Sequence, residues 1–232
     1  MVPLNSTATP PLVSVVVRTM GRPTLPLALA SVAAQTWRPL EIVLVDAAGA
    51  GTAVRDYADI PVQVVGGGRL DRPRAANAGL AAARGEWITF LDEDDTIEPD
   101  HIALLVATAT VAGLPVSYGQ TRLIGPDGVQ RVFGAPFSRA ALLRSNYIAI
   151  HAALFHRGFV DGGVRFDESL ATFEDWDFWL QLSARSDFAF TGKPTATYRA
   201  AAGESGAGAG PNLDRDAVLA QRARLMQKWQ AG

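Results

Sequence analysis

The chain has 232 residues, of which 48% are hydrophobic and 19% are charged, and this composition argues against a disordered segment. It contains no cysteine, which excludes disulfides, zinc–thiolate centres and cysteine nucleophiles. The 21 basic and 23 acidic residues give a net charge of −2, which weighs against a general nucleic-acid-binding protein. We therefore expect no nucleic-acid partner.

No run of about 18 uninterrupted apolar residues is present, so the sequence predicts no membrane span. The first residues lack the basic region followed by an apolar region that marks a signal peptide. We expect a cytoplasmic protein, and peripheral association with the inner face of the membrane is left open.

The first half of the chain alternates between apolar, β-branched runs and segments with helical spacing. Such runs suit strands that are buried on both faces of a sheet. Strands are expected at 12–17, 40–45, 61–65 and 86–91. Helices are expected at 24–36 with Thr24 as N-cap, at 54–58, at 73–84 with Gly85 just beyond the end, and at 101–112.

This alternation implies an α/β fold, in which a mostly parallel sheet carries helices on both faces. In such sheets, ligands bind beyond the carboxyl ends of the strands. Polar or flexible residues collect at those ends, namely Arg18 and Thr19, Asp46, Gly66–Gly68, and Asp92–Asp95.

The second half is less regular. Residues 126–128 (PDG) are typical of a hairpin turn, and an aromatic-rich helix is expected at 172–184. Residues 200–211 are low in complexity and are expected to form a flexible linker. Asn212 is the expected N-cap of a last helix in 212–232, which we expect to pack on its own domain.

Acidic residues are densest between Glu86 and Asp100. This segment holds seven carboxylates and neither a lysine nor an arginine. Adjacent carboxylates repel one another, most strongly where water is partly excluded, and a divalent cation relieves that repulsion. Magnesium and manganese take one or two carboxylates and complete their shells with water and substrate phosphates. The cluster predicts a Mn²⁺ or Mg²⁺ site for a diphosphate; the alternative is an acidic loop before a helix N-terminus.

Four segments, in this order, resemble the motifs of the family 2 glycosyltransferases, which have the GT-A fold. They are VSVVVRTMGRP (13–23), SVAAQTW with EIVLVD (31–37 and 41–46), RAANAGLAAARGEWITFLDEDD (74–95) and RFDESLATFEDWDFWLQL (165–182). The resemblance runs from 12 to about 199. It implies a tail at 1–11, a nucleotide-sugar-binding half at 12–120, and an acceptor-binding half with a smaller β/α region at 121–199 of the same domain.

The resemblance also implies a reaction. A metal-dependent inverting glycosyltransferase, with Mn²⁺ or Mg²⁺, would move a sugar from a nucleoside-diphosphate sugar to an acceptor hydroxyl. The acceptor would be a glycan, a lipid-linked molecule or a protein, in the synthesis of cell-surface polysaccharide, glycolipid or glycoprotein. Asp175, beside Glu174, matches the family's general base, which removes the hydroxyl proton.

The donor-side roles follow from the same motifs. Asp92 and Asp94 match the two acids of the DXD motif, with Asp94 on the metal and Asp92, next to Glu93, nearer the ribose or the metal's waters. The other implied donor-side residues are Arg18 and Thr19 in the nucleotide loop, Asp46 near the base and ribose, and Arg74 and Asn77 beside the donor. His151, within NYIAIHAALFHR, is a candidate for the diphosphate or metal; the alternative is a structural histidine.

One departure from the family pattern concerns the nucleobase. Ala47 stands where the family usually has a second acid, so the identity of the base is left open. Two other functions are also kept. One is a GT-A-like module that binds a nucleotide or glycan without turnover. The other is a haloacid-dehalogenase-type phosphatase, because residues 88–96 (ITFLDEDDT) fit its opening motif, with Asp92 as nucleophile and Asp94 as acid.

Overall fold

The computed structural model describes residues 9–125, 127–128, 130–200 and 214–230. Its strands are β1 (Val13–Thr19), β2 (Leu40–Asp46), β3 (Asp56–Tyr57), β4 (Ile60–Val65), β5 (Trp87–Asp92), β6 (Thr96–Ile97), β7 (Val116–Ile124), β8 (Gln130–Phe133), β9 (Ala153–His156) and β10 (Ala189–Arg199). Its α-helices are α1 (Leu25–Ala33), α2 (Arg72–Ala82), α3 (His101–Ala112), α4 (Arg139–Leu142), α5 (Gly158–Asp161), α6 (Glu174–Ser183) and α7 (Arg215–Gln230), with a 3₁₀ turn at Ile150–Ala152.

The strands form one mixed sheet in the order β3-β4-β2-β1-β5-β9-β7-β10-β6, with β8 paired to β7. Strands β4, β2, β1 and β5 are parallel, as the continuous apolar runs predict. Strand β9 runs antiparallel to both β5 and β7, and it joins the two halves of the sheet. The predicted boundary at 120/121 falls inside β7, so both halves share this sheet.

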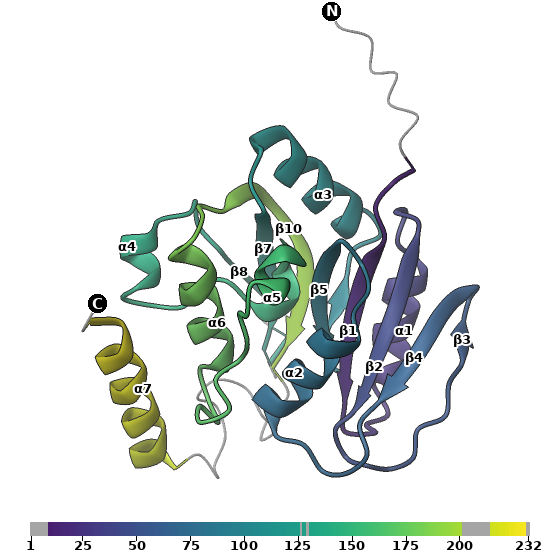
Figure 1. The fold of residues 1–232 in the computed structure, drawn as a ribbon, viewed down its shortest axis with the longest axis horizontal. Helices are drawn as coiled ribbons and strands as arrows, with labels where there is room; N and C mark the ends of the chain where they lie inside the picture. The colour runs from purple at the N-terminus through teal and green to yellow at the C-terminus, as the bar shows by residue number, and fades with distance from the viewer. Residues whose placement is uncertain (1–8, 126, 129, 201–213, 231–232) are drawn as a thin grey trace, which may run out of the picture.

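Helices cover both faces of the sheet and bury two apolar cores (Figure 1). Val16, Val43 and Val45 point to the face that α2, α5 and α6 cover. Val15 and Val17, the alternate residues of β1, point to the face that α1 and α3 cover. A sheet covered in this way leaves its strand ends as the places where polar side chains reach solvent.

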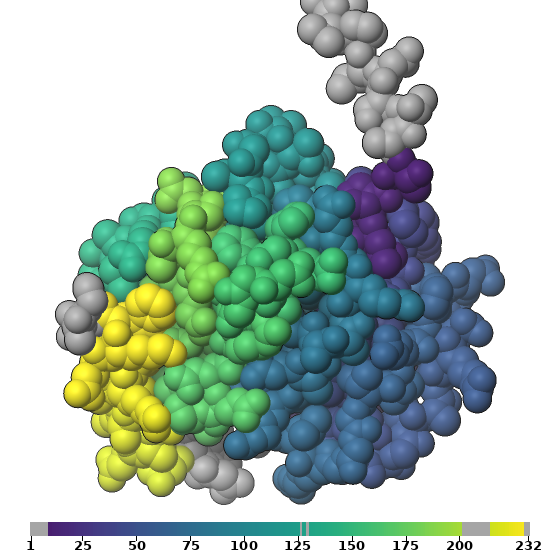
Figure 2. Space-filling view, in the orientation of Figure 1, coloured from purple at the N-terminus to yellow at the C-terminus, as the bar shows by residue number. Residues whose placement is uncertain are grey.

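The C-terminal helix α7 packs against α6, at the end of the molecule away from β3 (Figures 1 and 2). Leu225 is fully buried there, and Lys228 Nζ and Trp229 Nε1 both donate to the buried Asp177 of α6. The expectation that the last helix packs on its own domain is confirmed. Asn212, its predicted cap, and the predicted linker from 201 onward lie outside the described residues; Asp214 Oδ1 accepts from the first-turn N–H groups.

The predicted short helix at 54–58 is wrong. Two of these residues, Asp56 and Tyr57, form β3, which pairs with β4 through Asp56↔Pro61 and Tyr57↔Ile60. Ala58 and Asp59 have φ angles of 50° and 64°, both in the left-handed region that a two-residue hairpin turn requires. Neither residue is the glycine or asparagine that marks such turns most clearly, so the residue types at 58 and 59 did not indicate a hairpin.

Two predicted helix ends differ in detail. Thr24 occupies the N-cap of α1, but its hydroxyl makes no capping hydrogen bond. Gly85 does not have a left-handed backbone; a Cβ there would lie 2.5 Å from the Ser14 nitrogen, so close packing on β1 requires this glycine. No helix in the described part of the chain is long and apolar enough to cross a bilayer.

Candidate active site

The carboxyl ends of β1, β2 and β5 bring the predicted donor residues together. Arg18 of β1 pairs in register with Asp92 of β5, and Thr19 pairs with Asp46 of β2. Because adjacent parallel strands end at the same edge, residues separated by up to 74 positions become neighbours. The N-terminal end of α6, with Glu174 and Asp175, lies close to the Arg18 side of this edge.

Arg18 is the central cation of the site. Its Nε and Nη2 donate to the two carboxylate oxygens of Asp92 at 2.7 and 2.9 Å, a bidentate pair, and its guanidinium lies 5.8 Å from the Phe90 ring centre. Burial alone would lower the pKa of Arg18, but Asp92 raises it above its ordinary value. Burial would likewise raise the pKa of Asp92, and Arg18 holds it below its usual range.

Glu93 organises the loop after β1. Its buried carboxylate accepts from the Thr19 hydroxyl at 2.5 Å and from the N–H groups of Met20 and Arg22 at 2.8 and 2.9 Å. Thr19 also accepts from the Gly21 N–H at 2.9 Å. Glu93 and Thr19, both predicted to bind the donor, therefore shape the loop at 19–22 through side chains that are themselves buried.

Asp94 is the second acid of the predicted DXD pair, and it is paired with an arginine of the loop after β1. Its Oδ2 lies 2.9 Å from Arg22 Nη1, and its side chain is 22% exposed. Burial, followed by the charges of Asp95 and Asp92, raises the pKa of Asp94 to about 6. The excess of negative charge that the sequence predicted is thus present at this position.

His151 is fully buried beside Asp95, with Nδ1 at 2.9 Å from Asp95 Oδ2 but without the alignment of a hydrogen bond, and its Nε2 has no partner among the described residues. The Tyr198 ring stacks on His151 at 6.1 Å. Burial would lower the pKa of His151, but Asp95 raises it overall. Its ring is therefore held by an acid of the same cluster, and its predicted contact with a metal or diphosphate stays a prediction.

The side chains of the other predicted donor residues are engaged in local contacts. Asp46 accepts from the N–H groups of Gly49, Ala50 and Thr52, and the bond from Thr52 contributes most to lowering its pKa. It therefore shapes the loop after β2. Ala47 is buried, its N–H donates to the Thr19 carbonyl, and its carbonyl accepts from the Leu70 N–H.

Arg74 and Asn77 both connect α2 to the segment before α6. Arg74 is half-exposed and pairs with Asp71 and, at 3.3 Å, with Glu168. Asn77 makes two hydrogen bonds with the Phe166 backbone. Its Nδ2 donates to the Phe166 carbonyl at 3.0 Å, and its Oδ1 accepts from the Phe166 N–H at 2.9 Å. Contact of either residue with a donor remains a prediction.

The two predicted acceptor-side carboxylates lie at the start of α6. Phe173, immediately before them, has a φ angle of 65°, an uncommon conformation for a non-glycine residue. Glu174 is buried, and its Oε1 lies 3.8 Å from Arg18 Nη1. Burial and the neighbouring Asp175 raise the pKa of Glu174 to about 7.

Asp175 is half-buried, and each of its carboxylate oxygens accepts one hydrogen bond. Oδ1 accepts from the Trp176 N–H at 2.7 Å, and Oδ2 accepts from Asn146 Nδ2 at 3.0 Å. Burial raises the pKa of Asp175, an effect that these bonds and Arg18 only partly oppose. A fixed, partly accessible carboxylate with a raised pKa is a stronger base than an ordinary aspartate, which suits it to accept a proton.

Residues 14–163 match the family model described as "Glycosyl transferase family 2". The chain belongs to this family. Among curated relatives, the succinoglycan biosynthesis protein ExoO of Rhizobium meliloti is 32% identical over 176 residues, which cover 66% of this chain and 50% of ExoO. The uncharacterized glycosyltransferase YwdF of Bacillus subtilis is 27% identical over 185 residues, covering 74% of this chain and 68% of YwdF.

Solved structures show that this family 2 protein has the GT-A fold. The S. aureus TarS 1-349 structure in complex with UDP-GlcNAc aligns with a TM-score of 0.65 at 19% identity, covering 83% of this chain and 59% of the TarS chain. The corresponding UDP complex aligns with a TM-score of 0.61. The chain thus spans half the length of ExoO and about three fifths of that TarS chain.

Membership of family 2 removes the phosphatase alternative. The structure agrees, because Asp92, which would be the nucleophile, follows three parallel strands of the sheet and is held bidentately by Arg18.

Three further residues face this family 2 site and were not predicted as site residues. Asn146 contacts Asp175, Tyr198 stacks on His151, and Arg72 is among the charges that oppose the burial-driven rise in the pKa of Glu174 and Asp175. The sequence contained a signal for Arg72 alone, as one of three arginines after the glycine run at 66–68. Asn146 and Tyr198 come from irregular or late segments without a spacing pattern.

A divalent cation fits the donor side. Among the described residues, no three histidine or acidic side chains are arranged as a complete metal site. Magnesium, however, is commonly bound through one or two carboxylates, with water and substrate phosphates completing the shell. Asp94 has the oxygen donor and, through Asp95 and Asp92, the surplus negative charge for such a cation.

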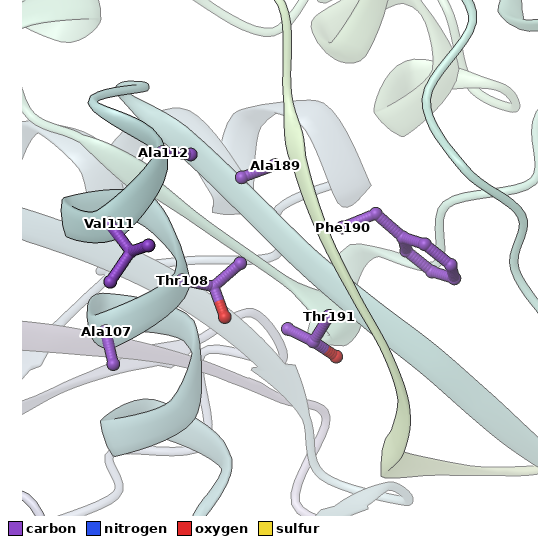
Figure 3. Close-up of a pocket in the computed structure, with 7 residues that line it drawn as sticks. All are labelled: Ala107, Thr108, Val111, Ala112, Ala189, Phe190 and Thr191. Carbon is purple, nitrogen blue, oxygen red and sulfur yellow. The ribbon is translucent and has the colours of Figure 1, made fainter.

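Two surface hollows lie away from these carboxylates. The larger, of about 460 Å³, lies between the C-terminal half of α3 and the start of β10 and is lined mainly by small side chains such as Ala107, Ala112 and Ala189 (Figure 3). Since α3 begins near the acidic cluster and runs back along the sheet, its C-terminal half lies toward the opposite edge. A second hollow, of about 230 Å³, is lined by Pro115, His156 and Arg185.

Proposed function

We propose that the chain is a glycosyltransferase that moves a sugar from a nucleoside-diphosphate sugar to an acceptor hydroxyl, with inversion at the anomeric carbon. One observation carries the proposal: Arg18 contacts both Asp92 of the DXD motif and Glu174, next to Asp175. Donor-side and base-side carboxylates thus border a single site. Family membership and the GT-A fold support the same reaction.

In this mechanism, Asp175 removes the acceptor's hydroxyl proton as the acceptor oxygen bonds to the anomeric carbon. The bond from that carbon to the diphosphate breaks on the opposite face, and inversion follows from this single displacement. The Trp176 N–H and Asn146 orient the carboxylate, which retains free lone pairs for the proton. A positioned general base contributes about 10²- to 10⁴-fold to the rate.

The proposed cofactor is Mn²⁺ or Mg²⁺, held by Asp94, with His151 as the predicted further ligand. When bound, such a cation would stabilise negative charge on the departing diphosphate. Arg22, whose Nη1 lies 2.9 Å from Asp94 Oδ2, would then share the Asp94 carboxylate with the cation. Arg18 keeps Asp92 ionised beside it.

The first donor to test is UDP-GlcNAc, because TarS was crystallised with it. The nucleobase is left to experiment, since Ala47 contributes backbone hydrogen bonds rather than an acidic side chain. ExoO is named for succinoglycan biosynthesis, which supports a glycan or lipid-linked acceptor. A protein acceptor is the remaining class to assay.

A nucleotide panel tests the donor site. UDP, GDP, dTDP and CDP would each be added with and without Mn²⁺, and thermal unfolding recorded. A ligand at 100 times its dissociation constant adds about 2.7 kcal/mol, or roughly 5–10 °C for a chain of this length. We expect a Mn²⁺-dependent shift with one nucleotide, which Asp94→Asn reduces. Equal shifts with and without Mn²⁺ in both proteins would refute the metal role.

Asp175→Asn tests the base. We expect the variant to bind the selected nucleotide normally and to release nucleoside diphosphate from the sugar nucleotide about 10²- to 10⁴-fold more slowly. Asp161→Asn, an exposed acid in the same half, is the matched control and should keep the wild-type rate. Transfer at the normal rate by Asp175→Asn would show that the base is assigned wrongly.

A binding module without turnover is the second candidate. It is favoured by the ion pairs of Asp92 with Arg18 and of Asp94 with Arg22, because each acid of the predicted DXD motif already has an arginine partner. Nucleotide-dependent stabilisation without release of product from any sugar nucleotide would support it. Turnover with any donor would eliminate it.

A further inference from the structure

We infer that Asn146 is a positioning residue for Asp175: its side-chain amide fixes the carboxylate in the orientation needed to face the acceptor hydroxyl. The inference rests on the proposed function, because it assigns to Asn146 a task only where Asp175 acts as the base. It concerns a residue from an irregular segment between α4 and β9, 29 positions before Asp175.

The geometry fixes which end of the Asn146 amide faces the base. Nδ2 donates to Asp175 Oδ2 at 3.0 Å, while Oδ1 accepts from the Ile148 N–H at 3.1 Å. Since the amide oxygen is engaged by its own loop, the NH₂ group is directed at the carboxylate. A rotation of the amide would break the second bond and place two oxygens together.

The loop that carries Asn146 is anchored by the base's own helix. Trp176 Nε1 donates to the Leu142 carbonyl at 2.6 Å, and Trp179 Nε1 donates to the Ile148 carbonyl at 3.1 Å. Both indoles are buried. The loop is therefore held on either side of Asn146 by residues that follow Asp175 on α6. Asn146 and Asp175 thus belong to one rigid unit.

The charged groups near Asp175 do not by themselves fix the orientation of its carboxylate, and Asn146 supplies a hydrogen bond that does. The charged groups that face Asp175 are Glu174 of α6, Arg18 of β1 and Arg72 of α2. None of them donates a hydrogen bond to Asp175 among the described residues; its two donors are Asn146 and the Trp176 N–H. Removing the amide leaves one oxygen of a half-buried carboxylate without its donor.

The direction of the effect on titration follows from this bond. A donor to a carboxylate favours its ionised form and lowers its pKa, so Asn146 opposes the rise that burial causes in the pKa of Asp175. Loss of the hydrogen bond from Asn146 should move the acid limb of the kcat–pH profile to higher pH.

The test uses two variants of Asn146 and one control. Asn146→Asp is nearly isosteric and keeps the oxygen that accepts from Ile148, whereas Asn146→Ala removes the side chain. Tyr147→Phe removes the neighbouring hydroxyl, which bonds to the Ser138 backbone and not to Asp175. Nucleoside diphosphate released from UDP-GlcNAc, or from the sugar nucleotide that the panel selects, gives kcat, KM and the pH profile; the ¹³C carboxyl signal of Asp175 gives its titration.

We expect both Asn146 variants to lose about 10- to 100-fold in kcat, with KM for the donor within about twofold of wild type. The Asp175 titration should move upward in both and more in Asn146→Asp, which adds a like charge. Tyr147→Phe should leave the titration unchanged. These results together support the inference.

Two results would overturn it, and they are distinguishable. If wild type turns over and the folded Asn146 variants keep its titration and kcat, the positioning role is wrong while the proposed function stands. If wild type turns over no sugar nucleotide, the proposed function is wrong and the inference falls with it.

Discussion

On the donor side of the molecule, two of the acids at the strand ends, Asp46 and Glu93, are held mainly by backbone N–H groups of the loops after β2 and β1. Asp46 accepts three such bonds, and Glu93 accepts two together with a hydroxyl. On the acceptor side, Asp177 is held by a lysine and a tryptophan from α7, and Asp175 by Asn146. These two donor-side acids are therefore held by backbone groups at the ends of adjacent parallel strands, whereas the base helix is held by side chains from α7 and from the segment before β9.

This difference has an energetic consequence. A backbone donor is part of the sheet and loop that carry the acid, so the same interactions stabilise both. A side chain from α7 can be lost without removing any strand. The acceptor side should accordingly be the more sensitive half to single substitutions far from the site.

The largest expected effect on stability is that of Lys228→Ala. It leaves the fully buried Asp177 carboxylate without its cation, which commonly costs 3–5 kcal/mol. Since Lys228 is 39% exposed, we expect about 2–3 kcal/mol, or a fall in Tm of roughly 5–10 °C. Arg224→Ala, at an exposed position of the same helix, is the control for thermal unfolding. Equal Tm values for the two variants would contradict the role of α7.

The next effect is a pH dependence at Glu174. Its folded pKa, about 7, lies above its ordinary value of 4.5, so the folded state binds the extra proton between these values. Glu174 therefore contributes stability that is lost as pH rises from about 4.5 to 7. Relative to wild type, Glu174→Gln should gain about 2 kcal/mol in free energy of unfolding between pH 5 and pH 8.

Urea unfolding at the two pH values measures this gain, with Glu86→Gln, at an exposed position, as control. A gain in Glu86→Gln as large as that in Glu174→Gln would show that the effect does not come from the buried carboxyl. A difference between wild type and Glu174→Gln that stays constant with pH would mean that Glu174 is ionised throughout.

The smallest effect tests the donor side. A Cβ on Gly79 of α2 would lie 2.3 Å from Val16 Cγ1, so Gly79→Ala forces α2 away from β1. We expect a loss of about 1–2 kcal/mol, because the strain exceeds the gain in helix propensity. Gly67→Ala meets no atom within 4 Å and should be nearly neutral in the same unfolding assay. If Gly79→Ala were stabilising, the helix–strand contact would be looser than described.

The sequence by itself determined the strands of the parallel sheet, because continuous β-branched runs such as 12–17 and 40–45 have few other stable environments. It also determined where the polar strand ends would meet, since parallel strands end at one edge. It did not predict β9, a short strand with no alternation, or the hairpin at Ala58 and Asp59, whose residues do not mark a left-handed turn.

Tertiary structure alone decided how each site side chain is held. The motifs identified Arg18, Asp92 and Glu174 separately, but only the folded chain brings one guanidinium into contact with both acids. Asn146 and Lys228 have no spacing that points to α6, because their contacts cross 29 and 51 positions and depend on packing. Sequence periodicity reports which face of an element is buried, and the partner of each buried or half-buried charge follows only from the assembled core.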